Sequence, residues 1–216
     1  PDGTLFLCDD PTQSLFRYFS WKQKGVDVRG RSKLLRVPFR CTREISTAAH
    51  ALVEDDAFLN SHNSDLTKPL LDSSEIVVGD VPVIVKFKNN FSEVDYIQNK
   101  VMNLLDEGIL GTNIAILCHR KHYINNWKRL RNYDVYVESF AKMKGLEFDY
   151  VFIPMINTIF ENPKDIEKDA YFVSKKRREI FTAMTRAKWH LTLTYQGDFP
   201  KGLEAIIEHC HQSYKR

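Results

Sequence analysis

The sequence predicts an α/β fold with a mainly parallel sheet flanked by helices. Short apolar runs of strand length alternate with amphipathic helical segments through most of the 216 residues. This alternation is typical of a parallel sheet that is covered on both faces. The length and the 43% hydrophobic content suffice for one sizeable domain, and no internal repeat interrupts it.

The expected elements follow one another along the chain. Strands are predicted at 4–8, 34–37, 83–87, 113–118, 135–138, 150–154 and 189–195. Helices are predicted at 42–53, from a Ser92–Asp95 capping box to a stop at Gly108, and at 120–130, 174–188 and 203–210. Because ligands of such sheets bind at the carboxyl ends of strands, we expect chemistry in the loops after Leu7, Leu35 and Val137.

Composition excludes little about function. The net charge of +3 permits nucleic-acid binding without arguing for it. The four cysteines form no CxxC pair and no zinc spacing, so we expect reduced, mostly buried thiols. No apolar run approaches 18 residues and no leader is evident, which predicts no membrane partner and a cytoplasmic location, in a bacterial cytosol or nucleoid.

Two blocks in the second half of the chain carry most of the functional signal. Residues 177–195 read RREIFTAMTRAKWHLTLTY, and residues 135–154 read VYVESFAKMKGLEFDYVFIP. They resemble motifs VI and V of the UvrD/Rep family of superfamily 1 helicases. Two departures occur in motif V, where Ser139 stands in place of Thr and Ala141 in place of His.

Three further blocks resemble the same family, in the family's order. Residues 5–21 (LFLCDDPTQSLFRYFSW) resemble motif III, although Asp9 replaces a Gly and Phe19 an Arg. Residues 34–45 (LLRVPFRCTREI) resemble motif IV, and residues 113–120 (NIAILCHR) resemble the next family strand. The resemblance implies a RecA-like domain of the P-loop NTPase type.

The resemblance also implies roles for single residues. Arg40 and Arg186 would reach the γ-phosphate of ATP, and Gln13 would sense that phosphate. Glu147, beside the flexible Gly145, would meet the nucleotide sugar. Nucleic-acid contacts are implied for four residues, of which the aromatic pair would stack on bases: Phe16, Tyr18, Ser139 and Lys144.

The phosphate-cradling loop GxxxxGK[ST] is absent, because none of the nine glycines precedes a Lys. We therefore expect the first RecA-like domain, with its Mg²⁺ ligands, to lie outside this sequence. Residues 1–21 would be a remnant of that domain, with its last strand and motif III, and residues 22–216 would be the C-terminal RecA-like domain. Only about 17 residues separate Arg120 from Glu138, so the family's accessory insertion is expected to be reduced.

The implied function is the C-terminal motor domain of an ATP-dependent DNA helicase or translocase, inactive alone. Its cofactor would be ATP with Mg²⁺, and its partners DNA, single-stranded or partly duplex, and the first RecA-like domain. Two alternatives stay open. In the first, the chain is a helicase-like module without catalysis that binds DNA or docks a protein. In the second, it belongs to a superfamily 1 branch that acts on RNA.

Overall fold

A single parallel sheet organises the part of the chain that the computed structural model describes, which comprises residues 25, 40–54, 56, 70–160 and 170–215. Its strands are β1 (Val83–Phe87), β2 (Ile114–Cys118), β3 (Tyr136–Ser139), β4 (Phe148–Ile153), β5 (Ala187–Gln196) and β6 (His211–Lys215). Their order across the sheet is β3-β2-β4-β5-β1-β6, and every neighbouring pair is parallel.

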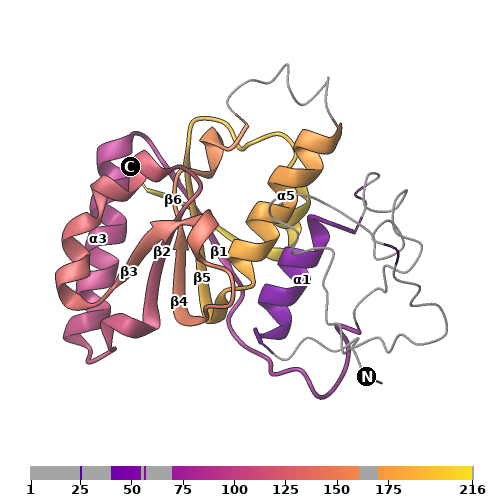
Figure 1. Ribbon diagram of the computed structural model, residues 1–216, viewed down its shortest axis with the longest axis horizontal. Coiled ribbons are helices and arrows are strands. Elements are labelled where there is room, and N and C mark those ends of the chain that lie inside the picture. The colour runs from indigo at the N-terminus through magenta and orange to yellow at the C-terminus, as the bar shows by residue number, and fades with distance from the viewer. Residues whose placement is uncertain (1–24, 26–39, 55, 57–69, 161–169, 216) are drawn as a thin grey trace.

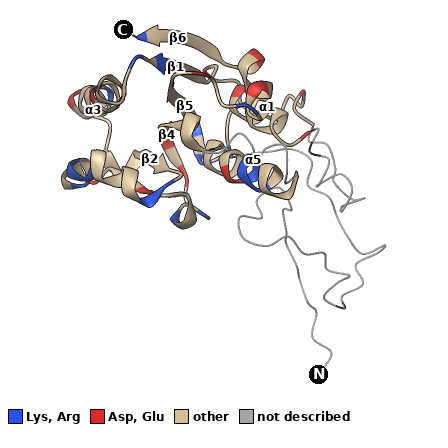
Figure 2. Cartoon of the chain, turned by 90° about the horizontal axis from the view of Figure 1, so that it is seen from above, with Lys and Arg blue, Asp and Glu red and all other residues tan. Residues whose placement is uncertain are grey.

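Helices cover both faces of the sheet, which confirms the predicted fold class. In Figure 1, α3 (Asn90–Asp106) lies on one side of the strands, and α1 (Arg43–Ala51) and α5 (Ala170–Met184) lie on the other. The view from above in Figure 2 shows the same three layers, with acidic and basic segments on both α3 and α5. Layered parallel sheets of this kind position loops at two opposite edges, and those edges decide where a site can form.

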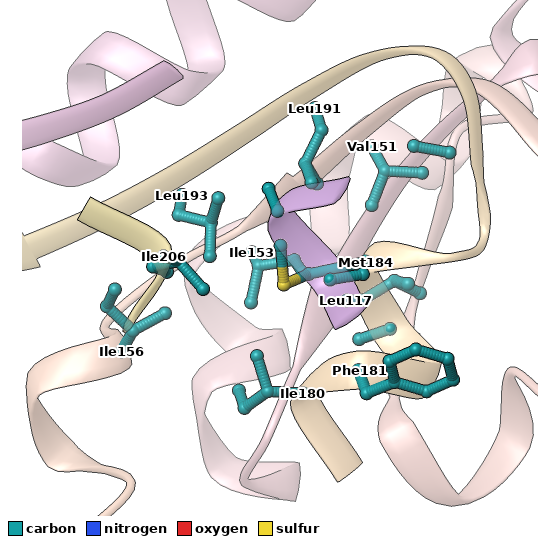
Figure 3. Packing of buried hydrophobic residues seen from close by; sticks show 14 of the residues in the cluster. Leu117, Val151, Ile153, Ile156, Ile180, Phe181, Met184, Leu191, Leu193 and Ile206 are labelled. Atoms are coloured by element: carbon teal, nitrogen blue, oxygen red, sulfur yellow. The ribbon is translucent and has the colours of Figure 1, made fainter. Parts of the chain in front are cut away.

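The larger core cluster lies between the sheet and the α1/α5 layer (Figure 3). Ile180, Phe181 and Met184 of α5 pack with residues of the central strands β2, β4 and β5. The strand residues are Leu117, Val151, Ile153, Leu191 and Leu193. Because Ile180 and Met184 are fully buried one helical turn apart, the carboxyl-terminal turn of α5 is held firmly against the sheet.

The second core cluster joins α3 to the other face. Ile97 and Val101 of α3 are fully buried with Ile116 of β2. Trp127 seals this layer from the β2–β3 connection, and its indole N–H donates to the carbonyl oxygen of Val94 at 3.3 Å. That connection holds two 3₁₀ helices, η4 (Lys121–Asn126) and η5 (Lys128–Tyr133), where the sequence predicted one α-helix over 120–130.

Other boundaries differ from prediction for local reasons. The N-cap of α3 is Asn89, whose side chain accepts the Ser92 N–H at 3.0 Å, so the predicted Ser92–Asp95 capping box is wrong. Gly108 follows the helix with φ of 89°, which confirms the predicted stop. The α5 helix ends at Met184 rather than Lys188, since Ala187 already pairs with Phe148 in the sheet.

The last strand was missed by the sequence prediction. The 3₁₀ helix η8 (Glu204–His209) occupies the place of the predicted helix 203–210, and β6 follows it at the sheet edge. Four of the five β6 residues are exposed, so the strand has neither an alternating nor an apolar pattern. The predicted strands at 4–8 and 34–37, and the domain boundary after residue 21, lie outside the described residues.

Candidate functional site

Two of the predicted site residues immediately precede neighbouring strands. Glu147 comes before β4 and Arg186 before β5, and the first residues of these strands, Phe148 and Ala187, are paired. The backbone N–H of Phe148 donates to the carbonyl oxygen of Arg186 at 2.9 Å. Both residues therefore lie at the amino-terminal edge of the sheet. The sequence analysis expected chemistry in the loop after Val137, at the carboxyl end of a strand. Glu147 lies at the opposite edge, because that loop crosses the sheet before it reaches Glu147.

Arg40 joins the same edge through an ion pair. Its Nε donates to Glu147 Oε1 at 2.5 Å, and the two side chains are 35% and 42% exposed. The main chain beside Arg40 is fixed, since the Thr42 N–H donates to the carbonyl oxygen of Lys188 in β5 at 3.2 Å. Residues that are 107 positions apart in sequence thus meet at one point.

Arg186 occupies the buried side of this group. Only 1% of the residue is exposed. Its Nε donates to the carbonyl oxygen of Thr182 at 3.0 Å and its Nη1 to that of Leu146 at 3.2 Å. Nη2 lies 3.4 Å from Thr185 Oγ1. The guanidinium therefore links the last turn of α5 to the loop that carries Glu147.

The Cys41 thiol is buried next to Arg40. Burial raises the pKa of its thiol, while the hydrogen bond with Ser46 and the charges of Arg40 and Arg186 act in the opposite direction. The thiol is 7% exposed, and its sulfur lies 3.1 Å from Ser46 Oγ.

The loop before β4 is open to solvent. Gly145 has φ of 82°, a left-handed conformation that favours glycine, and a Cβ added there would meet nothing within 4 Å. Lys144 and Leu146 on either side are exposed, whereas Met143 is fully buried and anchors the loop in the core. The loop therefore presents Lys144, Gly145 and Glu147 at an open surface.

The structure does not place Ser139 with this group. Ser139 ends β3 opposite Cys118, at the carboxyl-terminal edge of the sheet. About six residues of strand separate that level from Phe148, which corresponds to roughly 20 Å. The described residues predicted to contact the nucleotide therefore lie at the amino-terminal edge of the sheet. Ser139, which is predicted to contact nucleic acid, lies at the opposite edge. Gln13, Phe16 and Tyr18 lie outside the described residues.

A buried carboxylate at the carboxyl-terminal edge was missed by the sequence prediction. Glu93 is fully buried in the first turn of α3. Its Oε1 accepts the N–H of Met155 at 2.8 Å and the hydroxyl of Thr194, and its Oε2 accepts the amide of Gln196 at 2.7 Å. A signal was present, because Glu93 shares the helical stripe of Ile97 and Val101 at four-residue spacing.

Metal and membrane features add nothing to this site. Across residues 40–54, 56, 70–160 and 170–215, no three His, Cys, Asp or Glu side chains gather in a way that could hold a metal ion. None of the helices in the same ranges combines the length and the apolar character needed to cross a bilayer.

Guanidinium groups donate to anions and a carboxylate accepts from a hydroxyl, so Arg40, Arg186 and Glu147 have the chemistry to hold a ligand that carries both features. Comparison with known families identifies the kind of domain. Residues 128–198 match the family model of the UvrD-like helicase C-terminal domain. The resemblance predicted from motifs V and VI is thereby confirmed for the segment that contains Lys144, Gly145, Glu147 and Arg186.

A solved structure is similar to this chain in its fold. It is the C-terminal domain of a possible DNA helicase from Lactobacillus plantarum WCFS1, with a TM-score of 0.55 and 18% sequence identity. The alignment covers 81% of this chain and 98% of that one. No curated protein matches the chain.

Proposed function

We propose that this chain is the C-terminal motor domain of an ATP-dependent DNA helicase or translocase. The observation that supports the proposal is the meeting of Arg40, Glu147 and Arg186 at the amino-terminal edge of β4 and β5. In this role Arg40 and Arg186 stabilise the γ-phosphate, while Glu147 accepts a hydrogen bond from the nucleotide sugar beside Gly145.

The chemistry of the group suits phosphoryl transfer. Such a reaction needs positioning and neutralisation of charge more than covalent catalysis, and a planar guanidinium supplies both. Arginines of this kind raise the rate by about 10³- to 10⁵-fold in other nucleotide hydrolases. Arg186 would exchange the Leu146 carbonyl for a phosphate oxygen when ATP binds.

The remaining parts of the proposed motor follow from the motif resemblance. ATP with Mg²⁺ would be held mainly by a first RecA-like domain that carries GxxxxGK[ST], a loop that these 216 residues do not contain. Gln13 would sense the γ-phosphate. Four residues would contact nucleic acid: Phe16, Tyr18, Ser139 and Lys144. The protein would act in the cytoplasm. The structural relative is a possible DNA helicase, which supports DNA as the nucleic acid.

The first test concerns ATP hydrolysis by the full-length protein that contains this chain. We expect single-stranded DNA to stimulate the ATPase, and the 216-residue chain alone to be inactive. Arg40→Ala is the informative variant, because its partly exposed side chain can be removed without disturbing the core. It should lower kcat at least tenfold, whereas Arg129→Ala, at an exposed position on η5, should leave kcat unchanged.

A non-catalytic module is the second candidate, and the exposed Ala141 in place of the family His favours it. An ATPase that is indifferent to Arg40→Ala would support this candidate and contradict the motor. Stronger stimulation by single-stranded RNA than by single-stranded DNA would instead point to an RNA-acting protein.

A further inference from the structure

The contact between Arg40 and Glu147 joins the proposed phosphate ligand to the proposed sugar ligand. Arg40 Nε donates to Glu147 Oε1 at 2.5 Å, so in this structure each side chain uses part of the other's hydrogen-bonding capacity. A carboxylate that accepts from a guanidinium has less capacity to accept from a sugar hydroxyl, and a guanidinium so paired offers less charge to a phosphate.

The pair can open at small cost. Both side chains are more than one third exposed, and ion pairs in contact with solvent are weak. Arg186 differs, since it is buried and donates to the carbonyl of Leu146, the residue before Glu147. The segment 146–147 therefore holds one arginine through its backbone and the other through its side chain.

We propose that the Arg40–Glu147 ion pair is a resting contact that a nucleoside triphosphate opens by replacing both partners at once. The sugar hydroxyl donates to Glu147 and the γ-phosphate accepts from Arg40, so each side chain exchanges its hydrogen bond in the pair for one with the ligand. Glu147 is then a positioning residue for Arg40 as well as a sugar ligand. This inference rests on the proposed function of the site.

The exchange predicts a selectivity for linked sugar and phosphate. Inorganic tripolyphosphate can take Arg40 but offers no hydroxyl to Glu147, whose carboxylate would remain unpaired beside the phosphates. ATP satisfies both groups. Removing the charge of Glu147 should therefore help tripolyphosphate more than it helps ATP.

The experiment measures KM for ATP and the inhibition constant of tripolyphosphate in the DNA-stimulated ATPase of the full-length protein. In Glu147→Gln, the ratio of the inhibition constant to KM should fall by about two- to fivefold, as expected for an exposed ion pair. Asp149→Asn is the matched control, because Asp149 lies two residues away and pairs with Lys188 at 3.0 Å, so it removes a neighbouring paired charge. The ratio should not change in Asp149→Asn.

The outcomes separate the two proposals. A wild-type protein without DNA-stimulated ATPase would overturn the proposed function. An active wild type with the same ratio in Glu147→Gln, or an equal fall in Asp149→Asn, would overturn the exchange alone. A second readout uses NMR spectra of the full-length protein: the Nε–H signal of Arg40 should be protected from solvent exchange and should lose that protection in Glu147→Ala, which removes the acceptor. Unchanged protection would also contradict the resting contact.

Discussion

His119 is held neutral by its surroundings at the carboxyl end of β2. Burial lowers its pKa to about 3, and the positive charges of Arg120 and Lys176 act in the same direction. The hydroxyl of Thr158 donates to the carbonyl of Met155 at 2.9 Å, so the Nε2 of His119, 3.0 Å from Thr158 Oγ1, carries the ring hydrogen. Its Nδ1 is buried without a hydrogen-bond partner among the described residues.

This residue should make stability depend on pH. Its folded pKa lies below its ordinary value of 6.5, so the unfolded chain takes up the proton first as the pH falls. The free energy of unfolding should therefore decrease between pH 7 and pH 5, by up to about 2 kcal/mol from His119. Urea unfolding at both pH values measures the decrease, which should shrink in His119→Phe and persist in His122→Phe, an exposed neighbour. An equal decrease in His119→Phe would contradict the assignment.

At the residue scale, sequence and structure agree best where a motif names both residue type and neighbours. The motif resemblance brought out Arg40, Glu147 and Arg186, which the structure gathers although 146 positions separate the first from the last. The ion pair between Arg40 and Glu147 was not predictable. It depends on how the loop before β4 crosses the sheet, and no local pattern encodes that path.

Among the elements, α3 is joined to the carboxyl-terminal edge by one carboxylate. Glu93 connects its first turn to Met155 after β4 and to Gln196 at the end of β5. Met155 has φ of 57°, a left-handed conformation that a side chain seldom adopts. The hydrogen bond from its N–H to Glu93 therefore stabilises a turn that has an intrinsic cost.

Removing this carboxylate should loosen the joint. Glu93→Ala leaves the buried Met155 N–H and Thr194 hydroxyl without an acceptor, so the free energy of unfolding should fall by about 2–4 kcal/mol. Asp95→Ala, at an exposed position of the same helix, should change it by less than about 0.5 kcal/mol. Urea denaturation at pH 7 gives both values. A Glu93→Ala protein as stable as Asp95→Ala would show that the network contributes little.

The elements also show why some predictions were wrong. The β2 strand, buried on both faces, was located within one residue, because its apolar run is continuous. The η4 and η5 helices are too short for a periodic pattern, and their place is fixed by the burial of Trp127 and Leu130. The end of α5 was set by strand pairing between Ala187 and Phe148, a tertiary effect that outweighs helix propensity.

For the whole molecule, β6 decides how the described sheet ends. It is an edge strand whose single neighbour, β1, would otherwise present its own edge to solvent. The β1 strand is strongly apolar (VIVKF), whereas β6 is polar and includes Lys215. A polar edge strand that covers an apolar one protects a sheet from edge-to-edge association.

Replacing residues 211–215 by a Gly-Ser sequence of the same length should therefore promote self-association. The expected result is a concentration-dependent increase in light scattering, together with faster amide exchange in β1. The variant Lys215→Ser, which keeps the strand but removes one charge, is the control and should stay close to wild type. Unchanged scattering and exchange in the replaced chain would mean that β6 contributes no protection.

The predicted α/β class is confirmed because the alternation of strands and helices extends through most of the chain, so errors in single boundaries do not change it. What the pattern could not supply was the edge of the sheet at which the predicted site residues lie. The general preference for carboxyl ends favoured Ser139, whereas Glu147 and Arg186 lie where β4 and β5 begin.

The buried position of Arg186 has one more consequence. Its guanidinium closes the carboxyl end of α5, because the carbonyl of Thr182 in the last turn receives its Nε. The carboxyl end of a helix carries partial negative charge and repels anions. The Arg186 side chain, which would bind a phosphate in the proposed function, also covers the carbonyl oxygen of Thr182 at this helix end. If Arg186 turns outward, the last turn of α5 loses its cap. Ligand binding to Arg186 would then be accompanied by fraying of the last turn of α5, which packs on the central strands.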